Sequence, residues 1–179
     1  MSPVAPARGR PVRTTLTRDK RGTTSLDLAM IFPFMMALFF GCIEVTQLVR
    51  AYMGLGVSTE AMADLLSHGD PDTAAQVLDA CNGAKLVMSP FTGGTFKAAI
   101  SNVKNTGGTL AVSWSNNTCG IATTSSDAIT VGTSMVPNSA DEVIVVQTSY
   151  VYTAATSFVM PASYTLTYSA FARPRVPPP

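Results

Sequence analysis

The chain has 179 residues, enough for one domain, and its formal net charge at pH 7 is +1. The charge is uneven, because residues 1–22 contain six Lys/Arg and one Asp, whereas the rest of the chain contains six Lys/Arg and ten Asp/Glu. A basic end can bind nucleic acid, but this one adjoins an apolar segment of membrane length. The positive-inside rule then predicts a cytoplasmic N-terminus, an exported C-terminal part and no nucleic-acid partner.

The apolar segment runs from Leu28 to Ile43 without a charge, and Val45 to Val49 extend it past the single acid Glu44. As a helix, 22 residues from Leu28 rise about 33 Å, close to the thickness of a bilayer's hydrocarbon core. A cleavable secretory signal would be shorter and would end in an A-x-A site, which is missing here. The residues alone therefore indicate a membrane anchor, and an uncleaved signal anchor remains one alternative.

Both ends of this segment carry a motif, RGTTSLDLAMIFP at residues 21–33 and GCIE at residues 41–44. The two motifs together resemble the N-terminus of the TadE-like family, which are minor pilin-like (pseudopilin) proteins of the tight-adherence, or Flp, pilus. The resemblance is strong over residues 21–50 and returns weakly at residues 173–175. It implies a pilin-like subunit that supports the assembly or initiation of a Flp-type pilus.

The resemblance also implies roles for single residues. A prepilin peptidase would cleave between Gly22 and Thr23, which makes Asp27 the fifth mature residue. That acid would pair with the free α-amino group of a neighbouring subunit, since a charge inside a membrane is costly without a partner. The family has Glu followed by Phe where this chain has the shorter Asp27 and then Leu28. A simpler role for Asp27, at the interface in the first turn of the helix, stays open.

Pro33 and Glu44 fall on two further positions of the family pattern. Pro33 removes a backbone donor and is expected to kink or loosen the helix, which would ease extraction of the subunit from the bilayer. Glu44 lies 17 residues beyond Asp27, about 25 Å along a helix, and so near the outer interface. A carboxylate at headgroup level and a role in subunit packing are both open for it.

Beyond the membrane the helix is expected to continue, with a bend near Gly54 and Gly56, and to end at residues 68–69. Asp70 and Pro71 would open a short helix from Asp72 to Ala80. Alternating apolar residues then predict four strands, separated by turns at 105–108, 116–117, 137–139 and 161. The alternating residues are Phe96, Ala98 and Ile100, then Leu110, Val112 and Trp114, then Ile144, Val146, Tyr150 and Tyr152, and last Tyr164, Leu166 and Tyr168.

Such strands need cover on one face, and the emerging helix can supply it. The expected fold is α+β and pilin-like, a long N-terminal membrane-spanning helix packed on an antiparallel sheet of about four strands. It divides into a basic, disordered leader (1–22, removed on cleavage), the spanning and emerging helix (23–68), an exported α+β domain (69–175) and a proline tail (176–179). The implied location is the bacterial inner membrane, crossed once with the C-terminal domain in the periplasm, with the extracellular pilus as a further destination.

Three cysteines and one histidine limit the chemistry. Cys81 and Cys119 both lie in the exported part, where a disulfide can form, and closing that loop would stabilise the fold by about 4 kcal/mol. Cys42 is expected to act as a small apolar residue. The sequence holds no metal-binding or catalytic motif, and its one histidine, His68, falls at a helix end. We expect no metal, no cofactor and no enzymatic activity.

Two classes of function remain from the sequence. The first is the assembly subunit, whose partners would be the prepilin peptidase, other minor pilins, the major pilin, the inner-membrane pilus platform and membrane lipid. The second is a signal-anchored periplasmic binding or accessory module with an uncleaved tether. Removal of the leader at Gly22 separates the two, because a simple tether gains nothing from a new N-terminus.

Overall fold

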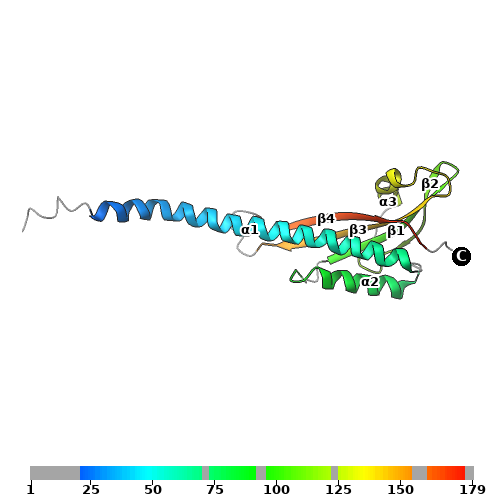
Figure 1. Ribbon diagram of the computed structural model, residues 1–179, viewed down its shortest axis with the longest axis horizontal. Coiled ribbons are helices and arrows are strands. Elements are labelled where there is room, and N and C mark those ends of the chain that lie inside the picture. Colours follow the sequence, from blue (N-terminus) through cyan, green and yellow to red (C-terminus); the bar gives the residue numbers. More distant parts are fainter. Residues whose placement is uncertain (1–20, 70–72, 92–95, 122–124, 155–160, 176–179) are drawn as a thin grey trace, which may run out of the picture.

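The computed structural model describes residues 21–69, 73–91, 96–121, 125–154 and 161–175. The fold is α+β, with a long N-terminal helix and a four-stranded antiparallel sheet, as the sequence predicts. The sheet and the shorter helices gather around the second half of the long helix, whose first half projects away from them (Figure 1). We call this gathered part the head. The expected leader (residues 1–20 of it), the tail at 176–179 and the expected helix start at Asp70 and Pro71 lie outside the described residues.

Helix α1 (Arg21–His68) is 48 residues long and continues without interruption through Pro33, Gly54 and Gly56. It ends at His68, where the sequence predicts its end. The Nδ1 atom of His68 lies 2.8 Å from the carbonyl oxygen of Asp64, so the imidazole can satisfy one of the carbonyl groups left free in the last turn.

Strands β1 (Phe96–Thr106), β2 (Thr109–Asn116), β3 (Glu142–Thr153) and β4 (Ser163–Ala172) coincide with the four alternating runs. Their order is β2-β1-β3-β4, and each neighbouring pair is antiparallel. Gly107 and Gly108, with φ of 62° and 92°, form the turn between β1 and β2. Two successive residues with positive φ match the twist of a hairpin and favour glycine.

Each face of the sheet has its own cover. Ile100, Ile144 and Val146 face α1 and α2 in the larger core, and Val103 and Val145 belong to a second core on the other face. Helix α3 (Ser125–Gly132) and the short 3-10 helix η2 (Thr133–Met135) lie over the second core. The sequence does not predict α3, because its eight residues are too few for a clear helical period.

Helix α2 differs from its prediction at both ends. It runs from Ala74 to Val87, rather than from Asp72 to Ala80, and passes through Asn82 and Gly83. Its buried side chains recur at helical spacing and face the larger core, so burial outweighs the low helix propensity of Asn and Gly. These side chains are Val77, Ala80, Cys81 and Ala84.

Candidate functional site

The first half of α1 has no other element packed on it, and we call residues 24–43 its bare half. No residue from Thr24 to Ile43 is buried, and all the large apolar side chains between Leu26 and Phe39 except Met36 and Pro33 are 54–73% exposed. Surrounding this much apolar surface with water is unfavourable, at roughly 25 cal/mol per Å², so this half of the helix requires an apolar environment or partner. Within the described chain, α1 is the one helix that is long and apolar enough to cross a membrane.

The residues expected to act in processing and pairing lie at the far end of this bare half. Gly22 and Thr23 fall in the first turn of α1, and Asp27 is exposed in its second turn. Removal of residues up to Gly22 would bring Asp27 from the seventh to the fifth residue of the helix, nearer the N-terminus, where a helix dipole favours an acid. Pro33 is also exposed, and the carbonyl group of Ala29 loses its usual helical donor there.

Glu44 is where α1 enters the head. Its side chain is only 2% exposed, and it is the first buried residue along the described helix after Thr24. The structure therefore does not place it as an exposed carboxylate at headgroup level, and it lies about 25 Å along α1 from Asp27. The pKa of Tyr152, near the end of β3, is raised first by burial and then by the negative charge of Glu44.

A shallow groove of about 690 Å³ follows one side of the bare half, from Phe34 to Thr46. Small residues at i and i+4, Ala37 and Gly41, lower the surface there, and larger apolar residues line the sides. The Thr46 hydroxyl donates to the Cys42 carbonyl at 2.7 Å, so this polar group is satisfied within the helix. Helices in membranes approach closely at such small residues, and another helix would fit this groove.

The second half of α1 is joined to β4 by an aromatic contact. An added Cβ at Gly56 would lie 3.4 Å from the ring of Tyr168, at the close limit of van der Waals contact, so the ring packs directly on the helix at this position. The Tyr168 hydroxyl donates to Glu60 at 3.1 Å, and this bond together with the Glu60 charge raises the pKa of Tyr168. The ring of Tyr52 packs edge-on against the ring of Tyr168, with 6.0 Å between the ring centroids.

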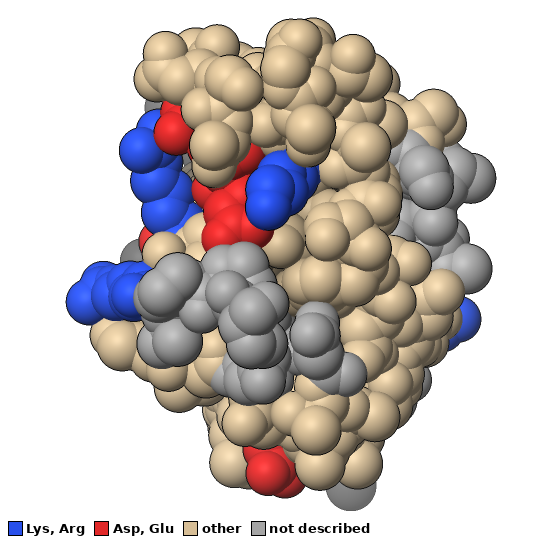
Figure 2. Space-filling view, turned by 90° about the vertical axis from the view of Figure 1, so that its right-hand side faces the viewer, with Lys and Arg blue, Asp and Glu red and all other residues tan. Residues whose placement is uncertain are grey.

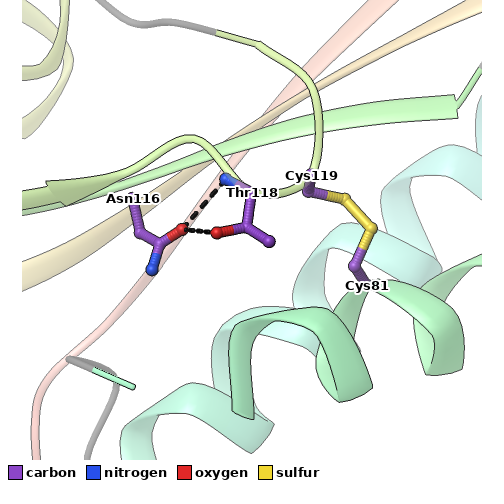
Figure 3. Close-up of a disulfide and its surroundings, with 4 residues drawn as sticks. All are labelled: Cys81, Asn116, Thr118 and Cys119. Carbon is purple, nitrogen blue, oxygen red and sulfur yellow. Dashed lines mark hydrogen bonds between the residues drawn. A yellow bond between two sulfur atoms is a disulfide. The ribbon is translucent and has the colours of Figure 1, made fainter. Parts of the chain in front are cut away.

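A disulfide joins Cys81 in α2 to Cys119, just after β2, as Figure 3 shows. These are the two cysteines that the sequence analysis pairs, and their Cα atoms are 6.1 Å apart. Asn116 organises the intervening turn, because its side-chain oxygen accepts hydrogen bonds from both the backbone and the hydroxyl of Thr118. The bond links α2 to the edge of the sheet at a point where α2 and the sheet share the larger core.

The end of the head farthest from the bare helix contains a cleft of about 730 Å³ between α1 and β4. Arg175 lies across it, with its guanidinium 3.4 Å from the carboxylate of Asp64 and its backbone N–H donating to the Ser67 carbonyl at 3.0 Å. Figure 2 shows acidic side chains flanked by basic ones at this end. The sequence does not predict this cleft, although residues 173–175 weakly resemble the family pattern.

The structure thus defines a class of protein: a head of α+β fold on a helix able to cross a membrane. No group of His, Cys, Asp or Glu side chains among its described residues could hold a metal ion. Comparisons with protein-family models, curated proteins and solved structures find no match to this chain.

Proposed function

We propose that this protein is a minor pilin-like subunit, anchored in the bacterial inner membrane by α1, that supports the assembly or initiation of a Flp-type pilus. A prepilin peptidase would remove the leader after Gly22. The observation that carries the proposal is the division of α1 at Glu44 into a bare apolar half and a half packed on the sheet. That division suits a subunit whose helix packs in a membrane first and against other subunits later.

Two further features support the proposal. The bare half carries the motif that resembles the TadE-like family, with Asp27 exposed and available to a partner. The groove beside Ala37 and Gly41 offers a surface on which a second helix can pack. The head is exported in this proposal, and an oxidising periplasm would maintain the bond between Cys81 and Cys119.

The role of Asp27 can be tested by complementing a strain that lacks the gene. We expect Asp27→Asn to reduce the number of surface pili at least about tenfold, since loss of one buried charge pair in a membrane costs more than 1.4 kcal/mol. Asp27→Glu, which restores the residue of the family pattern, should support normal piliation. Asp79→Asn is the matched control, because Asp79 is also an exposed acid of a helix, α2, but belongs to the head. Wild-type piliation with Asp27→Asn would contradict the pairing role.

A further inference from the structure

The hydrogen bond between the hydroxyls of Thr59 and Thr148, at 2.6 Å, gives a common reference level for α1 and β3. Ala154, the residue after β3, is six residues beyond Thr148. At a strand's rise of about 3.3 Å per residue, the distance between them along the strand is about 20 Å. The strand runs back along α1 towards its bare half (Figure 1). On α1, 20 Å back from Thr59 is about 13 residues, which reaches Thr46. Ala154, the last described residue after β3, therefore lies near the level at which α1 enters the head at Glu44.

The bare stretch of α1 ends at this same level. Thr24 to Ile43 are 20 residues, and they rise about 30 Å, the thickness of a bilayer's hydrocarbon core. Glu44, immediately afterwards, is the first residue of α1 that the head buries, and residues 45–50 are again exposed or half-buried before Ala51 is buried. If the hydrocarbon core surrounds the bare stretch, the described end of the hairpin lies next to the lipid surface.

The composition of the hairpin suits that position. The sequence contains no Asp, Glu, Lys or Arg from Val143 to Ala172. We call the described residues at the end of the hairpin the rim; they are Thr153, Ala154, Pro161, Ala162 and Ser163, of which all but Ala154 are exposed. The rim is closed by a backbone hydrogen bond from Ala154 to the carbonyl oxygen of Ala162 at 3.0 Å. The described side chains of the rim are small and uncharged, so they can enter an interface without burying a charge.

Aromatic and basic side chains lie directly behind the rim. Tyr152 and Tyr164 are cross-strand partners one pair further into the sheet than Thr153 and Ser163. The ring of Phe91 packs edge-on against Tyr152 at 6.3 Å. Arg50, exposed on α1, lies about 9 Å beyond Glu44 along the helix. Tyrosine and arginine are both favoured at the headgroup level of a membrane, where rings meet the acyl boundary and cations meet phosphates.

We propose that the rim lies in the headgroup layer of the outer leaflet, so that the lipid surface is a docking partner of the head. This rests on the proposed crossing of the membrane by α1. A headgroup layer is about 5–8 Å thick on each side, enough to take in the rim and to reach the level of half-buried Tyr164, whose cross-strand partner Tyr152 is buried in the core. The contact would fix the depth of α1 in the membrane, and it must break when the subunit leaves the bilayer.

Tryptophan fluorescence can measure this depth, because the chain contains a single tryptophan, Trp114. Asn102 of β1 pairs with Trp114 on β2 and with Ile144 on β3, so Trp114 lies at the level of Ile144. Ile144 is four residues from Thr148 along β3, on the side away from the rim. The native protein is thus an internal control for the far part of the head. The test variant carries Thr153→Trp in a Trp114→Phe background, and Ser163→Trp at the cross-strand partner is an independent second probe. Both probe positions are exposed, so the larger side chain displaces no core residue.

The full-length proteins would be reconstituted in vesicles of phosphatidylethanolamine and phosphatidylglycerol whose acyl chains are brominated next to the headgroup. We expect about a twofold loss of fluorescence for either rim probe and almost none for native Trp114, because bromine quenches only at close range to its own depth. Unquenched fluorescence from both rim probes, in protein that still floats with the vesicles, would overturn the rim proposal alone. Failure of the native protein to float with the vesicles would instead refute the membrane anchor and the proposed function with it.

Discussion

Thr59 on α1 and Thr148 on β3 lie with their hydroxyl oxygens 2.6 Å apart, both fully or almost fully buried, at the centre of the contact between helix and sheet. The Thr59 hydroxyl also lies 2.6 Å from the backbone carbonyl of Leu55. The Thr148 hydroxyl lies 3.3 Å from the backbone carbonyl of Tyr168. A polar pair inside an apolar contact has defined partners, so it specifies the register of α1 on the sheet more sharply than apolar packing alone.

The pair should show non-additive energetics. We expect Thr59→Val or Thr148→Val alone to lower the free energy of unfolding by about 1 kcal/mol, because each leaves the other hydroxyl with fewer partners. The double variant should cost less than the sum of the two, since two similar apolar side chains then meet. Urea unfolding of the protein in detergent measures all three values, and strictly additive costs would contradict the pairing.

Two glycines of α1 provide a matched test of its packing. An added Cβ at Gly54 would meet only the sulfur of Met88 at 3.7 Å, so Gly54→Ala should raise the free energy of unfolding by about 1 kcal/mol through helix propensity. Gly56 faces the ring of Tyr168 at 3.4 Å, so Gly56→Leu should lower it by about 2 kcal/mol through overpacking. Thermal unfolding of both variants would show opposite shifts. Equal shifts would mean that Tyr168 does not pack on this helix as described.

The disulfide should contribute much of the stability of the head. Its cysteines are 38 positions apart, and closing such a loop stabilises a fold by about 4 kcal/mol in the chain-entropy model. We therefore expect Cys81→Ala with Cys119→Ala to lower the free energy of unfolding by about that amount. Cys42→Ala is the control, because Cys42 is exposed on the bare half of α1 and outside the head. A double variant as stable as the wild type would show that the bond does not constrain the unfolded chain.

Glu44 and Asp27 are the two acids of the apolar segment, and the structure gives them different environments. Since Glu44 is buried, Glu44→Ala should lower the free energy of unfolding of the head by about 2 kcal/mol, the usual loss for a charged hydrogen-bonding group, and Glu44→Gln by less. Asp27→Asn should leave this stability unchanged, because Asp27 is exposed far from the head. Denaturation followed by circular dichroism separates the two. Equal effects would contradict the division of α1 at Glu44.

Much of the fold follows from periodicity in the sequence. Apolar residues alternate along all four strands, and glycine at position 69 marks the end of α1, so pattern alone locates these elements. The cover on both faces of the sheet does not follow from this pattern. The full extent of α2 could not be predicted, because Asn82 and Gly83 are poor helix formers that only tertiary burial of Cys81 and Ala84 overrides. Helix α3 was missed for a related reason, since its fixed place comes from packing on Val103 and Val145.

The candidate site was predictable only in part. A motif locates Asp27, Pro33 and Glu44 along one helix, but sequence spacing cannot tell that Glu44 is buried, because its cover comes from elements far along the chain. The cleft crossed by Arg175 is equally non-local, as it joins residues 111 positions apart. Contacts of that separation depend on the register between α1 and β4, which no local pattern encodes.

The most direct test of the central claim is the N-terminal mass of the protein extracted from membranes of cells with and without the candidate prepilin peptidase. The account predicts a chain that begins at Thr23 when the peptidase is present and keeps residues 1–22 when it is absent. Gly22→Ala should slow this cleavage strongly in cells that have the peptidase. An intact N-terminus in both strains would contradict the account, and the protein would then be a signal-anchored exported domain with an uncleaved tether.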